Sequence, residues 1–415
     1  MDWCSTGYYL SERPLFTLDP LFHQGAYYVQ EASSMFLEQL KQLVDLQAPL
    51  VILDLCAAPG GKSTHLMDLF PNSLIVSNEL IRSRAKILAE NCTKWGNSNS
   101  IVTNSEPAFL GQVVGMFDVI LIDAPCSGEG MFRKDVNARN EWSLNNVDNC
   151  VIRQKDIVKD ILPALKENGL LIYSTCTFNE KENDQNIRFF CNEWDLEIQR
   201  LPILPSSDIV VTENGYQFYP HKTKGEGFYM SFLLKTTNSN EKRLKNVISK
   251  DIKPVTVPLK QQLASFIQFK NNSLTTLDYF EYAEMLYLFP AQYSNQLYAL
   301  QQHCRIVQFG TKIGKFIKNK LHPEHDLLLN SSIHLDTFSQ VELNYDQAVS
   351  FLKKENFILD NTSLGWVILT FNNLPLGWIK SMGNRFNNYY PNELKIYNSN
   401  LKGNFSINQF QAPSK

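Results

Sequence analysis

The sequence predicts an α/β fold built on a parallel, doubly wound sheet, and three observations point to it. Short apolar runs of strand length recur in the first half of the chain, at residues 51–55, 74–77, 117–123 and 169–174. Helical patterns lie between these runs, and such alternation is typical of parallel strands covered on both faces. A glycine-bearing loop follows the first run, as it does in many ligand-binding α/β sheets.

The remaining elements of the first half follow from the same patterns. A weaker strand is expected at residues 100–103. Helices are expected over about residues 30–46, 65–70, 82–95, 147–166 and 179–194. Gln30–Ser34 is interpreted only as a cap for the first of these helices. Two strands near residues 215–219 and 228–234 should close the sheet as an antiparallel pair.

The second half of the chain lacks this regular alternation of strands and helices. Residues 235–256 are polar and charged without an apolar period, which favours a linker. Helices are expected at about residues 259–269 and 277–286. The strand-forming runs in residues 365–378 flank Asn372-Asn373, a pair typical of a hairpin turn.

Composition excludes several classes of protein. No apolar run approaches the 18 or so residues of a membrane helix, and the N-terminus MDWCSTGYYL lacks the layout of a signal peptide, so a cytoplasmic protein is expected. The 8 cysteines include no C-x-x-C pair. Neither a metal site nor a disulfide framework is therefore predicted.

Charge is unevenly distributed along the chain. Residues 235–415 carry 20 Lys and Arg against 13 Asp and Glu, whereas residues 1–234 carry 19 against 29. A basic C-terminal part suggests a polyanionic partner, although a solvated surface explains the same charge nearly as well.

The loop after the first strand has the form of a cofactor site. It consists of small or turn-forming residues that let the backbone approach a ligand closely before a helix opens: Cys56, Ala57, Ala58, Pro59, Gly60, Gly61 and Lys62. Glu79 lies nineteen residues after Gly60, at the end of the second strand. Doubly wound folds place there the carboxylate that binds ribose hydroxyls.

Two cofactors suit such a loop. A phosphate-binding loop requires G-x-x-x-x-G-K-[ST], and Gly61-Lys62-Ser63 satisfies its second half, but Cys56 stands where the first glycine should be. S-adenosylmethionine, which has ribose hydroxyls and no phosphates, therefore fits better than a nucleoside triphosphate. An ordinary strand-to-helix turn would be the simplest interpretation if the loop stood alone.

Two cysteines follow strands of the predicted sheet. Asp123 ends one strand and precedes Ala124-Pro125-Cys126, and Cys176 follows the strand at residues 169–174. Neighbouring parallel strands lie roughly 4.8 Å apart, so both thiols should converge at the ligand-binding edge. A capping box over residues 179–182 would place Cys176 just before a helix N-terminus, which lowers a thiol pKa. One buried cysteine is usually a small hydrophobe, but two at matched strand ends favour catalysis.

Three segments carry a family resemblance. LDLCAAPGGKSTHL, FDVILIDAPCSGEGMFRKD and LIYSTCTFNEKEND resemble the motifs of the Sun/RsmF-type RNA (cytosine-C5)-methyltransferases, across roughly residues 27–233. The tail GWVILTFNNLPLGWIKSMGNRFNNYYP resembles the PUA-like RNA-binding module of the RsmF branch. The resemblance implies a class I (Rossmann-like) S-adenosylmethionine methyltransferase sheet followed by a smaller α+β RNA-binding region. It also implies methylation of cytosine in small-subunit (16S) rRNA, with RNA or the small subunit as partner and no obligate protein partner.

The resemblance also implies residue roles. Cytosine C5 needs a thiolate added at C6 before it can take a methyl group. In the RNA enzymes this thiol corresponds to Cys176; DNA cytosine methyltransferases use the Pro-Cys thiol, which would make Cys126 the alternative. Cys126 is otherwise expected to help release the product, and Asp123 to bind the cytosine edge or the methionine end of the cofactor.

Cofactor contacts are implied at Cys56–Lys62, Glu79, Glu106 and Asp123. Glu106 departs from the family, which usually has Asp there against the adenine amino group. Cations at Arg84, Arg133 and Lys134 would suit phosphates, although solvent-facing cations are commoner. In the tail, aromatic and basic residues mix as on RNA-binding surfaces, although each aromatic alone more often belongs to a core: Trp366, Trp378, Lys380, Arg385 and Tyr389.

The expected domains are residues 1–48, a remnant of the N-terminal region with a leading helix; 49–235, the methyltransferase domain; 236–258, a linker; 259–340, a mixed helical domain; and 341–415, a PUA-like domain. Family members usually carry several dozen further residues ahead of this start. Three rival interpretations remain open from the sequence: a tRNA cytosine methyltransferase, a P-loop-like NTPase, and a non-catalytic RNA-binding or ribosome assembly factor.

Overall fold

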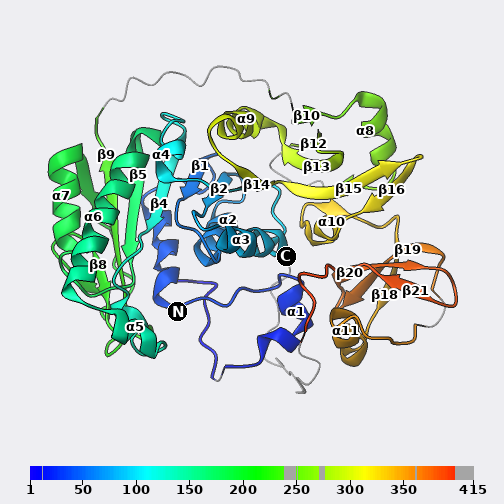
Figure 1. Ribbon diagram of the computed structural model, residues 1–415, viewed down its shortest axis with the longest axis horizontal. Helices are drawn as coiled ribbons and strands as arrows, with labels where there is room; N and C mark the ends of the chain where they lie inside the picture. Colours follow the sequence, from blue (N-terminus) through cyan, green and yellow to red (C-terminus); the bar gives the residue numbers. More distant parts are fainter. Residues whose placement is uncertain (12, 238–248, 250, 271–275, 360–361, 398–415) are drawn as a thin grey trace.

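The computed structural model describes residues 1–11, 13–237, 249, 251–270, 276–359 and 362–397. Its largest unit is a 10-stranded sheet in the order β14-β3-β2-β1-β4-β5-β9-β8-β7, with β6 paired to β9 (Figure 1). The five central strands are parallel: β1 (Val51–Asp54), β2 (Leu74–Asn78), β3 (Ser100–Thr103), β4 (Phe117–Asp123) and β5 (Leu165–Thr175). The α/β fold predicted from the alternating pattern is confirmed.

Antiparallel strands extend this sheet at both edges. On one side lie β6 (Leu196–Gln199), β7 (Val210–Val211), β8 (Tyr216–Phe218) and β9 (Phe228–Lys235). The predicted antiparallel pair is confirmed in β8 and β9. On the other side, β14 (Ile306–Phe309) comes from far along the chain and pairs with β3. The sequence predicts no strand there.

Helices cover both faces of the large sheet, because its central strands are apolar on both sides. One hydrophobic core lies under η2 (Ser33–Gln42), α2 (Gly61–Leu69) and α3 (Arg82–Trp95). The other lies under α4 (Pro107–Leu110), α6 (Leu144–Ile161), α7 (Asp184–Trp194) and α9 (Ser294–His303). Ile52 faces the first core, whereas Leu53 faces the second.

Three helix predictions differ from the structure in the first half. The helix expected over residues 147–166 is α6, which ends at Ile161; the 3-10 turn η4 (Leu162–Ala164) follows, and β5 already begins at Leu165. The helix expected over residues 30–46 is a shorter 3-10 segment, η2. The capping box expected at residues 179–182 is wrong: α7 begins only at Asp184, and its N-cap, Asn183, makes no side-chain capping bond. Asn183 instead uses its side chain on Thr175 and Thr177, which fixes the end of β5.

A second sheet occupies the middle of the chain. It runs β10 (Lys253–Pro254), β12 (Leu277–Tyr282), β13 (Met285–Pro290), β15 (Thr311–Ile317) and β16 (Lys320–Pro323), beside α8 (Val257–Leu263) and α10 (His325–Leu329). A separate pair joins β11 (Gln268–Phe269) to β17 (Ile333–His334). The predicted linker lies partly outside the described residues (238–248 and 250), and its last part contributes β10.

The helix predicted over residues 277–286 is wrong. These residues form the β12–β13 hairpin, whose turn residues Ala283 and Glu284 both have positive φ, 47° and 61°. Alanine and glutamate favour helices and rarely adopt this conformation, so the sequence carries no turn signal here. The region over residues 259–340 is consequently much richer in strands than the mixed helical domain that was expected.

The C-terminal unit is a 4-stranded sheet with one helix. Strands β18 (Ser339–Glu342), β19 (Gly365–Phe371), β20 (Leu374–Ser381) and β21 (Phe386–Asn388) lie beside α11 (Tyr345–Leu352). The predicted Asn372-Asn373 turn is confirmed, with φ of 50° and 61° at the two residues between β19 and β20. Residues 398–415 lie outside the described residues.

The N-terminal segment packs against this C-terminal unit. Leu18, at the end of η1 (Phe16–Leu18), lies in the same buried cluster as α11 and β19–β20. In α1 (Pro20–His23) and just after it, His23 Nδ1 lies 3.1 Å from the Tyr390 hydroxyl, and Gln24 Nε2 donates to the Leu374 carbonyl at 2.6 Å. The two ends of the chain therefore share one core.

Among the described residues, no helix is both long and apolar enough to cross a membrane.

Candidate active site

The two cysteines meet at the carboxyl edge of the large sheet. β4 and β5 are parallel neighbours with Asp123 opposite Ser174, so the residues that follow each strand lie side by side. Cys126 Sγ and Cys176 Sγ are 3.2 Å apart. The predicted convergence of the thiols is therefore present in the structure.

The surroundings favour the thiolate at Cys176. The hydrogen bond from the Cys126 thiol lowers the Cys176 pKa, and the positive charge of Lys62 acts in the same direction against the opposing effect of burial. The same hydrogen bond, together with burial, raises the Cys126 pKa. A helix N-terminus plays no part, because α7 begins eight residues after Cys176. The predicted direction of the Cys176 pKa holds, but its cause is a second thiol and a lysine.

Asp123 is held between two partners. Its Oδ2 accepts a hydrogen bond from Lys62 Nζ at 2.8 Å, and its Oδ1 accepts one from Ser174 Oγ at 2.8 Å. Burial alone would lower the Lys62 pKa, but the charge of Asp123 outweighs burial and the Lys62 pKa is raised. Lys62 therefore remains a fixed cation beside both the carboxylate and the thiols.

A buried carboxylate that the sequence analysis missed fixes the Cys126 loop. Glu182 Oε2 accepts from the Ser127 amide at 3.0 Å and from Gln154 Nε2 at 2.8 Å, while Oε1 accepts from Ser127 Oγ at 2.5 Å. Gln154 Nε2 also donates to the Pro125 carbonyl at 2.9 Å. Residues on both sides of Cys126 are thus tied to one carboxylate, and no local sequence pattern signals this.

The loop also requires a glycine at its far end. Gly130 donates its amide to the Cys176 carbonyl at 2.8 Å, and a Cβ at this position would lie 2.8 Å from that same oxygen. Only glycine allows the segment after Cys126, which continues into η3 (Glu129–Met131) and α5 (Val136–Glu141), to lie this close to the end of β5.

A cavity of about 200 Å³ lies in front of the glycine loop. Gly60, with φ of +117°, turns the chain into α2, whose first residue is Gly61. Asp54, at the end of β1, is fully buried and lines this cavity; its Oδ2 accepts from Ser63 Oγ, whereas its Oδ1 has no partner. Burial raises the Asp54 pKa to about 7. An unpaired carboxylate oxygen beside the Lys62 ammonium suits a ligand that carries both an amino and a carboxylate group.

The predicted loop residues divide between this cavity and the core. Those that line it are Cys56, Ala57, Ala58, Pro59, Gly61 and Lys62, together with Asp123. Residues 28–31 and Ser34 of the N-terminal segment complete the lining, although Gln30–Ser34 was interpreted from the sequence only as a helix cap. Glu31 shapes this part of the lining, because it accepts hydrogen bonds from the Ser34 and Glu226 amides.

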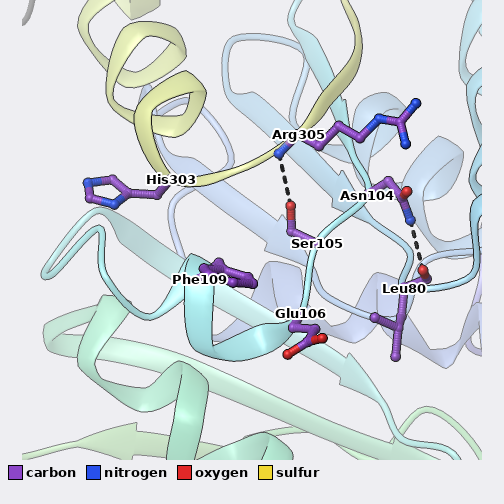
Figure 2. Close-up of a pocket in the computed structure, with 7 residues that line it drawn as sticks. All are labelled: Leu80, Asn104, Ser105, Glu106, Phe109, His303 and Arg305. Carbon is purple, nitrogen blue, oxygen red and sulfur yellow. Dashed lines mark hydrogen bonds between the residues drawn. The ribbon is translucent and has the colours of Figure 1, made fainter.

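A second cavity, of about 280 Å³, is lined by Glu106 and by Leu80, the residue after Glu79 (Figure 2). Glu79 is buried at the end of β2, 3.4 Å from Arg84 Nη1, and accepts from the Ile81 amide. Glu106 is exposed at the N-cap of α4 and lines this second cavity with Leu80 and Phe109. Glu79 therefore adjoins the second cavity through its neighbour Leu80, whereas Glu106 lines that cavity directly and does not line the first one.

Several cations predicted for phosphates are already paired. Arg133 and Lys134 both contact Glu226, and Arg84 donates to the Ala58 carbonyl besides its contact with Glu79. In the C-terminal unit, Trp378 belongs to the core and donates to the Glu324 carbonyl. The remaining aromatic surface is formed by Trp366 and Tyr389, with Lys380 Nζ 5.5 Å from the Trp366 ring.

The fold and the two cavities define an S-adenosylmethionine-dependent methyltransferase. Residues 41–234 match the family described as 16S rRNA methyltransferase RsmB/F, residues 1–32 match the N-terminal domain of 16S rRNA methyltransferase RsmF, and residues 338–396 match the methyltransferase RsmF PUA domain. The chain belongs to this RsmB/F methyltransferase family.

Individual relatives agree with this membership. A Shewanella woodyi protein described as ribosomal RNA small subunit methyltransferase F is 30% identical over 412 residues, covering 94% of this chain and 84% of that protein. A protein of the same description from Aliivibrio salmonicida is 30% identical over 411 residues, with the same coverage. Among solved structures, NSun6 from Pyrococcus horikoshii with SFG is 26% identical and covers 56% of this chain and 57% of that chain, with a TM-score of 0.46.

The NTPase interpretation is therefore wrong. Membership of a methyltransferase family excludes it, and the structure shows why the loop misleads. Lys62 and Ser63, which would bind phosphate and magnesium in a phosphate-binding loop, are engaged by Asp123 and Asp54.

Proposed function

We propose that the protein transfers the methyl group of S-adenosylmethionine to C5 of a cytosine in small-subunit rRNA, through a covalent bond between Cys176 and cytosine C6. The observation that carries the proposal is the 3.2 Å pair of sulfurs beside the cofactor cavity, with the thiolate favoured at Cys176. The descriptions of the Shewanella woodyi and Aliivibrio salmonicida relatives as ribosomal RNA small subunit methyltransferases support the rRNA target.

The cofactor would lie across both cavities. Asp54 and Lys62 suit the amino and carboxylate groups of its methionine end, and Glu79 suits the ribose hydroxyls. Leu80, Glu106 and Phe109 would surround the adenine. When bound, the cofactor supplies an electrophilic methyl group.

The residues of the chain perform the remaining chemistry. The Cys176 thiolate adds to C6, and the electron pair of the C5–C6 double bond moves to C5, which takes the methyl group. Asp123 would accept a hydrogen bond from the cytosine amino group and keep the ring oriented, since Lys62 and Ser174 fix the carboxylate. The methyl transfer leaves S-adenosylhomocysteine; transfer of the C5 proton to a base such as water then restores the double bond and expels the Cys176 thiolate. Cys126 is placed to assist this last step, 3.2 Å from the departing sulfur.

The target base must leave its stack to reach the cysteines. We propose that the C-terminal unit helps to hold the RNA, because Trp366 and Tyr389 offer aromatic faces beside Lys380. The match of residues 338–396 to a PUA domain supports this role.

Two single variants and their double test the proposal. Cys176→Ala should abolish methyl transfer with little change in cofactor affinity, because the thiol lies outside the residues that line either cavity. Cys126→Ala, incubated with S-adenosylmethionine and RNA, should accumulate a protein band shifted by covalently bound RNA on a denaturing gel. The double variant should show no such band.

The choice of RNA makes the test specific. Naked 16S rRNA, assembled small subunits and total tRNA should be supplied separately, and methylation or covalent capture is expected only with the first two. Capture of tRNA alone would replace the rRNA target. Methylation by Cys176→Ala would assign the nucleophile to Cys126, and no transfer to any RNA by the unaltered protein would favour a non-catalytic role.

A further inference from the structure

The cavity that holds Glu106 is built from two distant parts of the chain. Leu80, Asn104, Ser105, Glu106 and Phe109 come from the loops after β2 and β3 and from α4. His303 and Arg305 come from the junction between α9 and β14, more than sixty residues beyond the segment that matches the methyltransferase family model (Figure 2). The cavity is therefore incomplete without the second half of the chain.

Apolar side chains in this cavity lack a partner. Leu80 is 57% exposed and Phe109 is 46% exposed, although both are large hydrophobic residues. Both line the same hollow, next to the carboxylate of Glu106. A flat aromatic ring with an amino group at its edge would cover the apolar side chains and donate to the carboxylate, and the adenine of the cofactor has this chemistry.

The Arg305 backbone holds the loop of residues 104–106, which lines the cavity, through two hydrogen bonds. The Arg305 amide donates to Ser105 Oγ at 3.0 Å, and the Arg305 carbonyl accepts from the Asn104 amide at 2.9 Å. Both partners belong to the loop that leads into Glu106. This loop needs an external support, because β3 ends at Thr103, just before it.

Asn104, in the loop held by Arg305, in turn holds residues 79 and 80 on another side of the cavity. Asn104 Nδ2 donates to the Leu80 carbonyl at 2.8 Å (Figure 2), and also to the Glu79 carbonyl at 2.7 Å. A continuous set of hydrogen bonds thus runs from Arg305 through Asn104 to the residues proposed for the ribose and the adenine. A shift of the α9–β14 junction would therefore move the loop of residues 104–106 and the segment of residues 79–80 together.

The junction itself is anchored on both sides. On one side, His303 Nδ1 lies 2.9 Å from Gln112 Oε1, and Ile306 pairs with Thr103 of β3. On the other side, β14 passes through Gly310 directly into β15 of the middle sheet. Gly310 has φ of +53°, and a Cβ there would lie 2.1 Å from the Leu288 carbonyl of β13, so the connection is tight.

We propose that residues 303–305 are a working part of the cofactor site: they position the loops that hold the adenosine half of S-adenosylmethionine, so cofactor binding and docking of the second half of the chain strengthen each other. The coupling is reciprocal, because a ligand that needs the docked junction must also stabilise it. The inference rests on the cofactor and not on the proposed RNA target. Its tests measure cofactor binding alone. A negative result would therefore leave the proposed RNA methylation standing, and failure of RNA methylation would leave this inference standing.

Ser105→Ala is the sharpest perturbation, since it removes the hydroxyl that accepts from the Arg305 amide and that also bonds the Cys304 thiol, both within the junction. We expect affinity to fall by about three- to tenfold, the range for losing one hydrogen bond. Isothermal titration calorimetry should show the same fold loss of affinity for S-adenosylhomocysteine and for 5′-methylthioadenosine, which lacks the amino-acid end of the cofactor. In a methylation assay, KM for S-adenosylmethionine should rise and kcat should stay unchanged.

Gln308→Ala provides the matched control. Gln308 lies on β14, three residues after Arg305, and it also bonds to the first half of the chain, through Nε2 to Thr93 Oγ1 at 2.7 Å, but it does not line the cavity. Its affinity for both ligands should stay within about twofold of the unaltered protein, which is below the effect of one hydrogen bond. An equal loss in both variants would mean that strand docking in general, and not the junction, sets the affinity, and would overturn the proposal.

A measurement on the unaltered protein removes dependence on any variant. S-adenosylhomocysteine should slow hydrogen exchange at the amides of residues 303–306, including the Arg305 amide that donates to Ser105. Unchanged exchange at this junction, or a loss in Ser105→Ala that affects S-adenosylhomocysteine but spares 5′-methylthioadenosine, would refute the inference.

Discussion

Glu182→Gln should slow product release more than it slows any other step. Glu182 is fully buried and accepts three hydrogen bonds, two of them from Ser127 and one from Gln154. A glutamine can keep its oxygen at the position that serves the Ser127 amide and Gln154, while its amide group faces the Ser127 hydroxyl. That hydroxyl can rotate towards Thr177 Oγ1, 3.0 Å away. All three bonds can still form, but each changes from charge-assisted to neutral and is weaker, so the loop of Cys126 is held less firmly.

The magnitude follows from these bonds. Hydrogen bonds to a charged group contribute about 1.5–3 kcal/mol and neutral ones about 0.5–1.5 kcal/mol, so the exchange should cost the fold roughly 2 kcal/mol, allowing for the burial that already raises the Glu182 pKa. Glu182→Ala would be less informative. It would leave the Ser127 amide and Gln154 unpaired in the core, at about 1–3 kcal/mol each.

The catalytic effect passes through Cys126, which lies between Pro125 and Ser127. A loosened loop would no longer hold Cys126 Sγ 3.2 Å from Cys176 Sγ, and a displacement of about 1 Å can cost a reacting group up to roughly 100-fold in rate. Covalent protein–RNA should therefore persist on a denaturing gel, as with Cys126→Ala, while cofactor affinity stays unchanged. Urea unfolding measures the stability loss in the same samples.

Glu180→Gln is the control, because Glu180 is an exposed acid in the same turn. It should behave as the unaltered protein in both assays. Normal release by Glu182→Gln, together with the expected loss of stability, would refute the claim that the carboxylate acts on catalysis through the position of Cys126.

Two further predictions concern pH. Because the Asp54 pKa is raised to about 7, the folded protein keeps a proton that the unfolded chain has lost between about pH 4 and 7, and stability should fall by roughly 4 kcal/mol as pH rises through this window. Asp54→Asn should remove this slope in thermal unfolding measured across pH, and equal slopes would contradict it. Burial lowers the His325 pKa to about 4, so stability should be lost as pH falls from about 6.5 to 4, by roughly 3 kcal/mol. The test is the difference from the unaltered protein, because Asp54 contributes a slope of opposite sign over the same pH range. His325→Leu should gain stability relative to the unaltered protein as pH falls, whereas the exposed control His334→Leu should keep a constant difference; a constant difference for His325→Leu as well would refute the prediction.

The central strands could be predicted because their own residues determine them. β1, β2 and β4 are largely buried on both faces, so each is an apolar run ended by polar residues, interrupted only by Asp118 near the start of β4. The chemistry at their ends was equally visible, since Asp123 and the two cysteines follow neighbouring strands and parallel neighbours fix their relative positions.

The elements that could not be predicted depend on distant partners. β14 has one fully buried side chain, Phe309, and becomes a strand because β3 offers an unpaired edge. The capping box failed because Asn183 binds the end of β5 and the helix starts after it. Glu182 resembles an ordinary helix acid in the sequence, and only the fold shows that it holds the loop of Cys126.

The shared core of the two chain ends has a consequence for biosynthesis. Leu18, His23 and Gln24 pack against residues that are made late in synthesis, such as Leu374 and Tyr390. A chain that emerges N-terminus first must therefore keep its opening segment undocked until translation is nearly complete. The same holds for the edge of β3, which stays open until residues 306–309 arrive. Until these late residues are made, the nascent chain would expose an apolar segment and the edge of β3 even if the central strands have already paired. We expect chaperones to bind the nascent chain mainly during this interval.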